Sequence, residues 1–266
     1  MGHQRHTTPP RPATVPSRPS RVPQVQRKPA LARAMPLTRR YEIQAIDVQG
    51  ALTQKSAVAP ATPTFEDAFA GFARGTLITT TDGPIAVEDL CPGMQIVTKD
   101  NGPMPLLWIG SMMVFPGLPE LSEESVRLLR VTAESFGMGR PLPDLMLGPR
   151  ARVLFQHDAC RRMFGTPSAF APAHGFADGE SMITIQPVAP VRVYHVAVEG
   201  QQVLSANGLE VESFHPGARA DDMMDAETLD LFLSLFPHVR SIHEFGPMSY
   251  PRLSAHEVEM IRVDAA

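Results

Sequence analysis

Residues 75–90 read Gly-Thr-Leu-Ile-Thr-Thr-Thr-Asp-Gly-Pro-Ile-Ala-Val-Glu-Asp-Leu, and this stretch decides the fold. Its first half, Leu77 to Thr81, is rich in β-branched and apolar residues, which favour a strand. Asp82-Gly83 then supplies a residue pair typical of a tight hairpin turn, and Ile85 to Leu90 follows as a second β-prone run. The stretch therefore predicts a β-hairpin.

Short β-prone runs continue to alternate with turn residues on the C-terminal side of this hairpin. Turns are expected at Pro92-Gly93 and at Asp100-Asn101-Gly102, and successive turn signals are spaced by about 8 to 12 residues. The further predicted strands are Met94 to Lys99, Leu106 to Ile109, Val126 to Thr132, Ala151 to Phe155, Met182 to Gln186, Val191 to Val198 and Gln202 to Ala206. This spacing is typical of an all-β domain, and we expect a mainly β fold.

Residues 1–64 differ in composition from the rest of the chain. They hold ten Lys and Arg residues against two acids, whereas the remainder holds 14 basic and 26 acidic residues. Prolines are frequent through about residue 40, and such a segment buries too little apolar surface to offset its ordering entropy. We expect a disordered Pro/Arg-rich arm and linker over 1–64. Residues 41–48 could form a short helix or strand, but a weakly structured linker is favoured.

The pattern becomes helical after Pro216-Gly217. Apolar residues recur with a period near 3.6 from Asp221 to Phe236, and a last short helix is expected at Ser254, which fits a capping box with Glu257. The expected organisation is thus a β-domain over 65–217 and a helical extension over 218–266. If the apolar face of the 221–236 helix does not pack on the β-domain, it would suit a protein partner.

The cysteines and histidines give weak signals. Cys91 and Cys160 are the only cysteines and form no disulfide framework. Cys91 is expected to be a small packed residue, and the charge of neighbouring Arg161 would lower the pKa of Cys160. The histidines weighed as metal ligands are scattered and lack zinc-ligand spacing: His157, His174, His195 and His215. We expect no metal or cofactor.

Two other constellations can be drawn but are not favoured. Ser213 and His215, with Glu212 or Asp221, could form a hydrolase triad, but a triad is defined by geometry and no nucleophile-elbow motif is present. Asp144 and Glu134 could be paired carboxylates. The surrounding residues instead favour a turn that precedes a strand.

Membrane and nucleic-acid functions are not expected. No apolar run approaches the ~18 residues that span a bilayer, and the basic N-terminus lacks the apolar segment of a secretory signal. His6 also breaks the myristoylation pattern that Met1-Gly2 begins. A cytoplasmic location is the resulting expectation. The basic arm could contact phosphates non-specifically, but Tyr41 is its single aromatic residue, so a solvated tether is favoured over a specific nucleic-acid contact.

Several separated blocks of the chain resemble bacterial Hint (Hedgehog/intein-type) domains. The opening blocks are Phe72 to Ile78, Gly83 to Leu90, Pro92 to Met94, Lys99 to Gly102 and Leu107 to Gly110, and the closing blocks are Val193 to Val196, Val203-Leu204 and Asn207 to Phe214. They occur in the family's order. The resemblance implies a compact Hint-like β-domain and the family's autoprocessing reaction.

In that reaction the first residue of the domain attacks the carbonyl just upstream, and water, a sterol or another residue resolves the resulting ester. The family supplies a thiol or hydroxyl nucleophile and the histidine of a Thr-x-x-His or Ser-x-x-His segment, which protonates the departing amine. Here the nucleophile position is Gly71, and Gly148 and Ala151 stand where Thr or Ser and His belong. The resemblance thus implies a degenerate site without catalytic residues.

We therefore interpret the chain as a Hint domain that has lost self-splicing and self-cleavage and acts as a binding or scaffold module, not as an enzyme. One alternative is active autoprocessing through an unrecognised nucleophile. A weaker alternative is a binder of an anionic partner through the basic arm.

Overall fold

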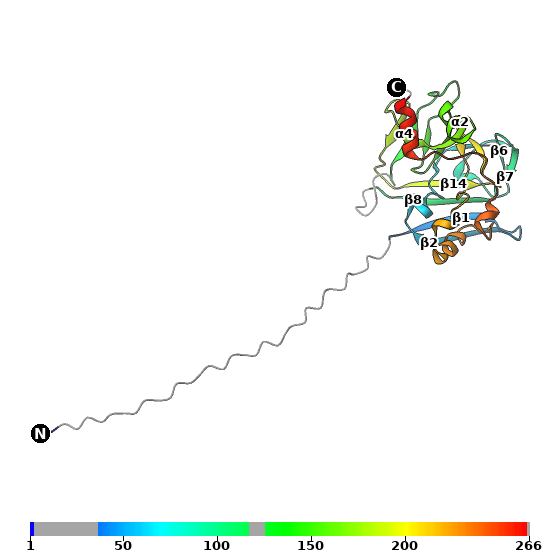
Figure 1. Ribbon diagram of the computed structural model, residues 1–266. Helices are drawn as coiled ribbons and strands as arrows, with labels where there is room; N and C mark the ends of the chain where they lie inside the picture. Colours follow the sequence, from blue (N-terminus) through cyan, green and yellow to red (C-terminus); the bar gives the residue numbers. More distant parts are fainter. Residues whose placement is uncertain (3–36, 117–125, 265–266) are drawn as a thin grey trace. The chain divides into compact units, whose positions relative to one another are not determined.

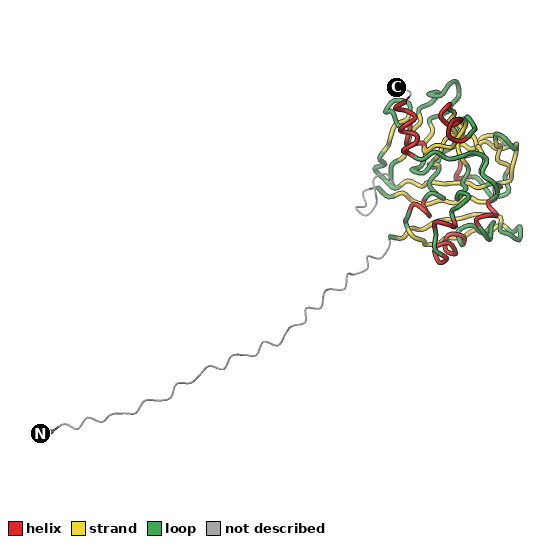
Figure 2. The backbone as a smooth tube through the Cα atoms, in the orientation of Figure 1, coloured by secondary structure: helices red, strands yellow, loops and turns green. Residues whose placement is uncertain are grey.

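The computed structural model describes residues 1–2, 37–116 and 126–264 (Figure 1). The expected disorder of residues 3–36 therefore lies outside the described residues. Within the described part of the chain, the fold is mainly β and consists of two large antiparallel sheets with few helices (Figure 2). This confirms the predicted fold class.

The first sheet has the strand order β13-β9-β10-β3-β14-β8-β1-β2. Its strands are β1 (Thr38–Ile46), β2 (Leu52–Pro60), β3 (Phe72–Ala73), β8 (Trp108–Val114), β9 (Leu128–Val131), β10 (Leu145–Leu147), β13 (Met182–Ile185) and β14 (Val191–Ala197). The short strand β3 pairs with both β10 and β14, so the residue just before it, Gly71, lies near the middle of this sheet.

The second sheet has the order β12-β11-β16-β15-β4-β6-β7, with β5 paired to β4. Its strands are β4 (Leu77–Thr80), β5 (Gly83–Ala86), β6 (Gln95–Thr98), β7 (Gly102–Pro105), β11 (Arg152–Gln156), β12 (Ser168–Pro172), β15 (Val203–Ala206) and β16 (Leu209–Glu212). The predicted hairpin is present, because Thr80 pairs with Gly83 across the turn. Its second strand is shorter than predicted, since residues 87–89 form a 3-10 turn.

Helical segments are short. They are α1 (Pro63–Glu66), η1 (Val87–Asp89), α2 (Asp158–Phe164), η3 (Ala173–Phe176), η4 (Asp221–Met223), α3 (Ala226–Leu233), η5 (Ile242–Phe245) and α4 (Ala255–Asp264). Among the described residues, no helix has both the length and the apolar character needed to cross a membrane. Helix α4 begins as predicted, because the Ser254 hydroxyl and the Glu257 carboxylate form reciprocal capping bonds.

The hairpin β1–β2 corrects the expectation of a linker up to residue 64. Strand β1 pairs along its full length with β2 and also with β8 of the Hint-like region. Its alternate residues Tyr41, Ile43 and Ala45 are buried in the core. Arg39 and Glu66 form a buried ion pair, with 2.7 Å between Nη2 and Oε1, which ties the hairpin to α1. The linker interpretation was wrong because the pairing partner, β8, is remote in sequence.

A cluster of aromatic side chains surrounds Trp108 in the first sheet. Phe69 and Phe236 lie with their ring centroids 5.2 and 4.9 Å from Trp108, whose indole N–H donates to the Leu235 carbonyl at 2.8 Å. Gly110 provides the room, since a Cβ there would lie 2.2 Å from the Trp108 ring. The C-terminal segment is therefore part of the same core as the sheet.

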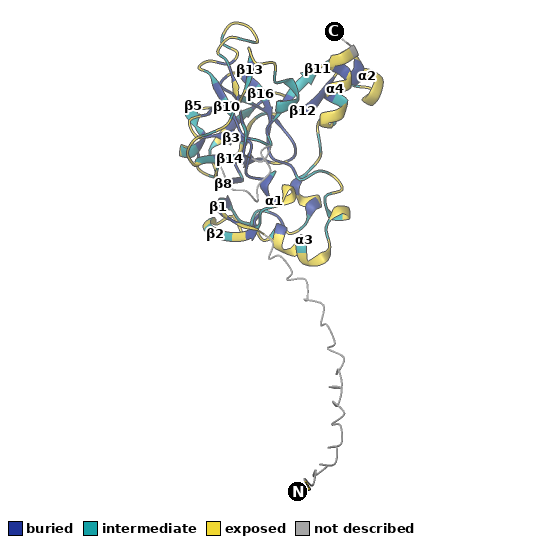
Figure 3. Ribbon diagram, turned by 90° about the vertical axis from the view of Figure 1, so that its left-hand side faces the viewer, coloured by how far each residue is buried: buried dark blue, intermediate teal, exposed yellow. Residues whose placement is uncertain are grey.

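The predicted partner surface on the 221–236 helix is not available. Phe232, Leu235 and Phe236 are fully or almost fully buried against this aromatic cluster, so the chain itself covers the apolar face. Figure 3 shows α1 and α3 at the end of the molecule that carries β1 and β2, and α2 and α4 at the other end. The expected single helix is also split, with η4 preceding α3.

We predict that Phe236→Ala lowers the free energy of unfolding by about 3–5 kcal/mol, because it leaves a cavity beside Trp108. Leu231→Ala on the neighbouring helix α3 is the matched control, since Leu231 is 37% exposed, and its cost should stay below about 1 kcal/mol. Guanidinium denaturation followed by the fluorescence of Trp108, the single tryptophan, measures both. Equal losses in the two variants would contradict this packing.

Candidate functional site

The peptide bond between Ala70 and Gly71 is held in place by backbone hydrogen bonds. The Gly71 N–H donates to Tyr194 of β14 at 3.0 Å, and its carbonyl accepts from the Gly148 N–H at 2.9 Å. The Ala70 carbonyl accepts from the Arg150 N–H at 3.0 Å. The structure thus brings together Gly71 and Gly148, which the sequence analysis placed at degenerate positions of one site.

Neither glycine has room for a side chain. A Cβ on Gly148 would lie 2.2 Å from the Ala70 carbonyl oxygen, and a Cβ on Gly71 would lie 2.9 Å from the imidazole of His195. Ala151 is 3% exposed, and its N–H donates to the Gly148 carbonyl at 3.3 Å. The backbone and His195 fill the space that side chains at positions 71 and 148 would need.

His195 lies on β14 with its ring buried between Phe72 and Phe214, at centroid distances of 5.2 and 5.7 Å. Burial, together with the smaller effect of the positive charges of Arg252 and Arg152, lowers the pKa of His195 to about 3. The imidazole is therefore neutral at pH 7. Because Nδ1 accepts from the Val196 N–H at 3.1 Å, the proton of this neutral ring is on Nε2.

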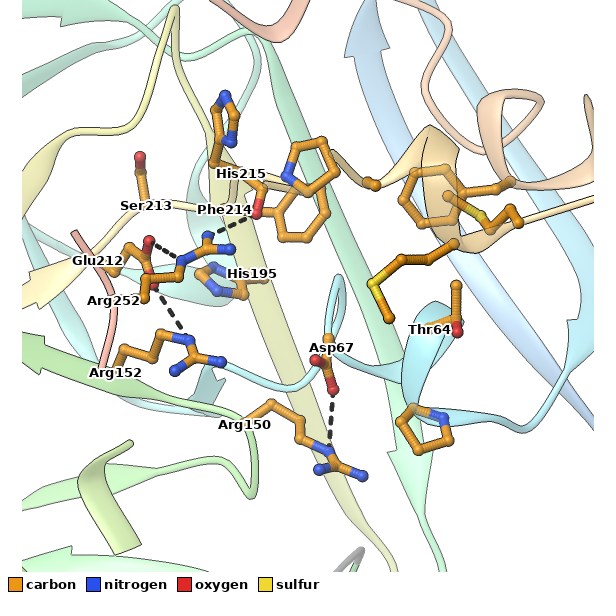
Figure 4. A pocket seen from close by; sticks show the side chains of 16 residues that line it. Thr64, Asp67, Arg150, Arg152, His195, Glu212, Ser213, Phe214, His215 and Arg252 are labelled. Carbon is orange, nitrogen blue, oxygen red and sulfur yellow. Dashed lines mark hydrogen bonds and ion pairs between the residues drawn. The ribbon is translucent and has the colours of Figure 1, made fainter. Parts of the chain in front are cut away.

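A pocket of about 300 Å³ lies beside His195 and Arg150. Its lining residues come from α1 and the turns around it, β11, β16 and the C-terminal segment: Pro63, Thr64, Asp67, Arg150, Arg152, His195, Glu212, Ser213, Phe214, His215, Pro216, Ala220, Met223, Met224, Phe232 and Arg252. Figure 4 shows the charged side chains on one side of this space and mostly apolar side chains, with Thr64, on the other.

Three arginines and two carboxylates form the charged side of the pocket. Glu212 pairs with Arg252 at 2.8 Å and with Arg152 at 3.5 Å, while Asp67 pairs with Arg150 at 3.1 Å (Figure 4). Desolvation raises the pKa of Asp67, against the opposing effect of the nearby arginines, and it lowers the pKa of Arg152. The group carries one more positive than negative charge, in surroundings from which water is partly excluded.

Comparison with known proteins identifies the family. The Hint domain family model matches residues 70–218, which is more than half of the chain. This chain belongs to the Hint-domain family. The solution structure of a bacterial intein-like domain from Clostridium thermocellum is similar, with 15% sequence identity and a TM-score of 0.39, over 54% of this chain and 99% of that one. No curated protein matches this chain.

The Hint match begins one residue before Gly71, so the Ala70–Gly71 bond lies at its N-terminal boundary. Two structural additions flank the matched region. The β1–β2 hairpin precedes it and the segment with α3 and α4 follows it. Both additions pack against the Hint domain, and the second supplies Met223, Met224, Phe232 and Arg252 to the pocket.

The hydrolase triad weighed from the sequence is not formed. Ser213 Oγ accepts from the Gln202 N–H at 2.9 Å. The His215 ring bonds to backbone groups through both nitrogens, to the Gly246 carbonyl and from the Gly217 N–H, each at 3.0 Å. Neither side chain is available to activate the other.

The expectations for the two cysteines were wrong. Cys91 is exposed instead of packed. Cys160 of α2 is buried against β12 and α4, and burial raises the pKa of its thiol, whereas neighbouring Arg161 was expected to lower it. Charge at the next position in sequence has little effect here, because desolvation of the thiol is the larger influence.

The carboxylate pair and the metal ligands were also weighed from the sequence. Asp144 accepts from the Ala133 N–H at 2.7 Å and pairs with Arg130, in the turn that precedes β10 as predicted. In the described part of the chain, no three His, Cys, Asp or Glu side chains are grouped to hold a metal ion.

Sequence reasoning missed the charged side of the pocket. Asp67, Arg152, Glu212 and Arg252 were not proposed together, because they lie on segments far apart in the chain. Two residues in the sequence could have indicated this charged group. Arg152 is the first residue of β11 and Glu212 is the last residue of β16, and a charged residue needs a partner when it is buried.

We predict that burial of His195 makes the protein acid-sensitive. Unfolded His195 binds a proton below its ordinary pKa of 6.5, whereas the folded protein does so only near 3, so stability is lost as the pH falls through this window. Lowering the pH from about 7.5 to about 5 should reduce the free energy of unfolding of the wild type. The reduction should be about 2 kcal/mol smaller in His195→Gln.

Urea denaturation at both pH values measures this difference. His243→Gln is the control, because the His243 side chain is 78% exposed, and it should keep the wild-type pH dependence. An identical pH dependence in His195→Gln and the wild type would show that His195 is not buried in its neutral form.

Proposed function

We propose that this Hint domain does not carry out the acyl shift of its family and serves instead as a binding module. The observation that carries the proposal is the packing around the Ala70–Gly71 bond. Gly71 has no nucleophilic atom, and a Cβ there would lie 2.9 Å from the imidazole of His195, closer than side chains normally approach. Nucleophilic catalysis needs an activated thiol, hydroxyl or amine within reach of the carbonyl.

The neighbouring hydroxyl and thiol groups do not supply a substitute. The Thr76 hydroxyl donates to the Met146 carbonyl at 3.3 Å, Cys91 is exposed, and Cys160 of α2 is packed against α4. His195 could be imagined as an acid for the departing amine, but its pKa of about 3 leaves it neutral and weakly basic. These features support the loss of both the nucleophilic attack and the protonation of the departing amine.

One backbone hydrogen bond at this position supports a site that serves another use. The Arg150 N–H still donates to the Ala70 carbonyl at 3.0 Å, as an oxyanion donor would. Around it, Arg150, Arg152 and Arg252 converge on a hollow that the acyl shift does not require. Concave sites with a few converging polar groups are typical of ligand binding, and this is the role that we assign to the domain.

Intact mass spectrometry of the purified full-length chain tests this proposal. We predict that the chain stays whole after prolonged incubation with hydroxylamine or dithiothreitol, because no ester or thioester forms for these nucleophiles to attack. A parallel sample kept denatured in guanidinium gives the background of ordinary hydrolysis. A cut between Ala70 and Gly71 that occurs in the native sample alone would overturn the proposal and favour autoprocessing through another nucleophile.

A further inference from the structure

We propose that the pocket beside His195 binds a small monocarboxylate with a short linear apolar tail. This inference rests on the proposed binding function and adds the chemical class of the ligand. It is drawn from the charge of one wall of the pocket, the apolar character of the opposite wall, and the volume between them (Figure 4).

The charged wall favours a single negative charge. Arg150, Arg152 and Arg252 carry three positive charges, and Asp67 and Glu212 balance two of them. One carboxylate would make the group neutral. A phosphate monoester carries about −1.5 to −2 charges at pH 7 and would leave excess negative charge beside two partly desolvated carboxylates.

The arginines differ in how fully their donors are used. Arg252 bonds to Glu212 Oε1 at 2.8 Å and to the His215 carbonyl at 2.6 Å. Arg150 forms an ion pair with Asp67, with 3.1 Å between Nε and Oδ1. These two buried atoms are close in space but do not form a hydrogen bond with each other or with another group. A planar guanidinium in this state suits a carboxylate, which can accept two parallel N–H bonds from it. Arg150 is therefore the expected anchor of the ligand.

Much of the rest of the lining is apolar, although Thr64 adds a hydroxyl group. Ala220, Met224 and Phe232 of the C-terminal segment line the pocket together with Pro63, and Phe232 belongs to the buried aromatic cluster. Methionine adapts its shape to bound apolar groups. A volume of about 300 Å³ lies at the lower end of small-molecule pockets, so a short chain fits and a large ring system does not.

Titration calorimetry of the full-length protein with butanoate, hexanoate and octanoate tests the inference. Affinity should rise by up to about fourfold for each methylene that enters the apolar end, because each buried methylene contributes about 0.8 kcal/mol. Octan-1-ol and octylammonium carry the same tail without the carboxylate and should bind at least about tenfold more weakly than octanoate, since they lose the charge-assisted bonds. Octyl phosphate carries the same tail with a larger negative charge, and it should also bind more weakly than octanoate.

Two variants at the charged wall should move the affinity in opposite directions. Arg150→Gln removes the anchor and should weaken octanoate binding by about tenfold or more. Asp67→Asn removes a competing carboxylate and should tighten binding by about fivefold. Arg74→Gln is the matched control, because Arg74 is 73% exposed and pairs with Glu88 away from this pocket, and it should bind as the wild type does.

Absence of saturable binding by octanoate to the wild type, or equal binding of octanoate and octan-1-ol, would overturn the inference. The gain expected in Asp67→Asn keeps the test decisive if Arg150→Gln folds poorly. Mass spectrometry of the same sample separates the two proposals. A cleaved chain contradicts the proposed function, whereas an intact chain that does not bind carboxylates contradicts only this inference.

Discussion

The contact between the backbones of residues 70–71 and 148–150 is the constraint on which the site depends. Three N–H groups, of Gly71, Gly148 and Arg150, are each used to fix the segment before β3 between β10 and β14. The approach is so close that a Cβ at Gly148 would lie 2.2 Å from the Ala70 carbonyl oxygen. Glycine is therefore required at this position by sterics, and the same contact sets the positions of Arg150 and of the β11 residues that follow it.

The C-terminal segment packs against the first sheet and completes the pocket. Trp108 packs against Phe236, and the buried α3 residues hold the turn that carries Met224 over the pocket. Arg252, from the same segment, returns to Glu212 on β16. The folded unit is thus larger than the Hint match over residues 70–218, because both flanking segments share its core and one of them supplies a wall of the pocket.

Local features of the sequence predicted the local structure. Asp82-Gly83 marked the β4–β5 turn, and Ser254 with Glu257 marked the start of α4, since turns and caps are decided by adjacent residues. The separated family blocks predicted the fold. Non-local pairing was not predictable in the same way. Strand β1 alternates buried and exposed residues, but its basic, proline-rich context concealed its pairing with β8, from which six strands separate it along the chain.

The pocket was not predictable for a related reason. Its charged residues are single positions on α1, β11, β16 and the C-terminal segment, and no spacing relates them in the sequence. The direction of the Cys160 pKa shift failed because it depends on burial, which a count of neighbouring charges does not contain. From the sequence, Gly71, Gly148 and Ala151 are predicted to stand at the family's reactive positions. The structure adds that His195 and the Ala70 backbone closely approach Gly71 and Gly148.

Restoring the family residues tests the central claim most directly. A Gly71→Cys, Gly148→Thr and Ala151→His triple variant restores the groups that the family resemblance implies, although His195 crowds position 71 and the Ala70 backbone crowds position 148. We predict a lower denaturation midpoint than the wild type and no dithiothreitol-dependent cut in the mass spectrum. A variant as stable as the wild type that releases residues 1–70 on addition of thiol would contradict the account, because it would show that the packing does not prevent the reaction.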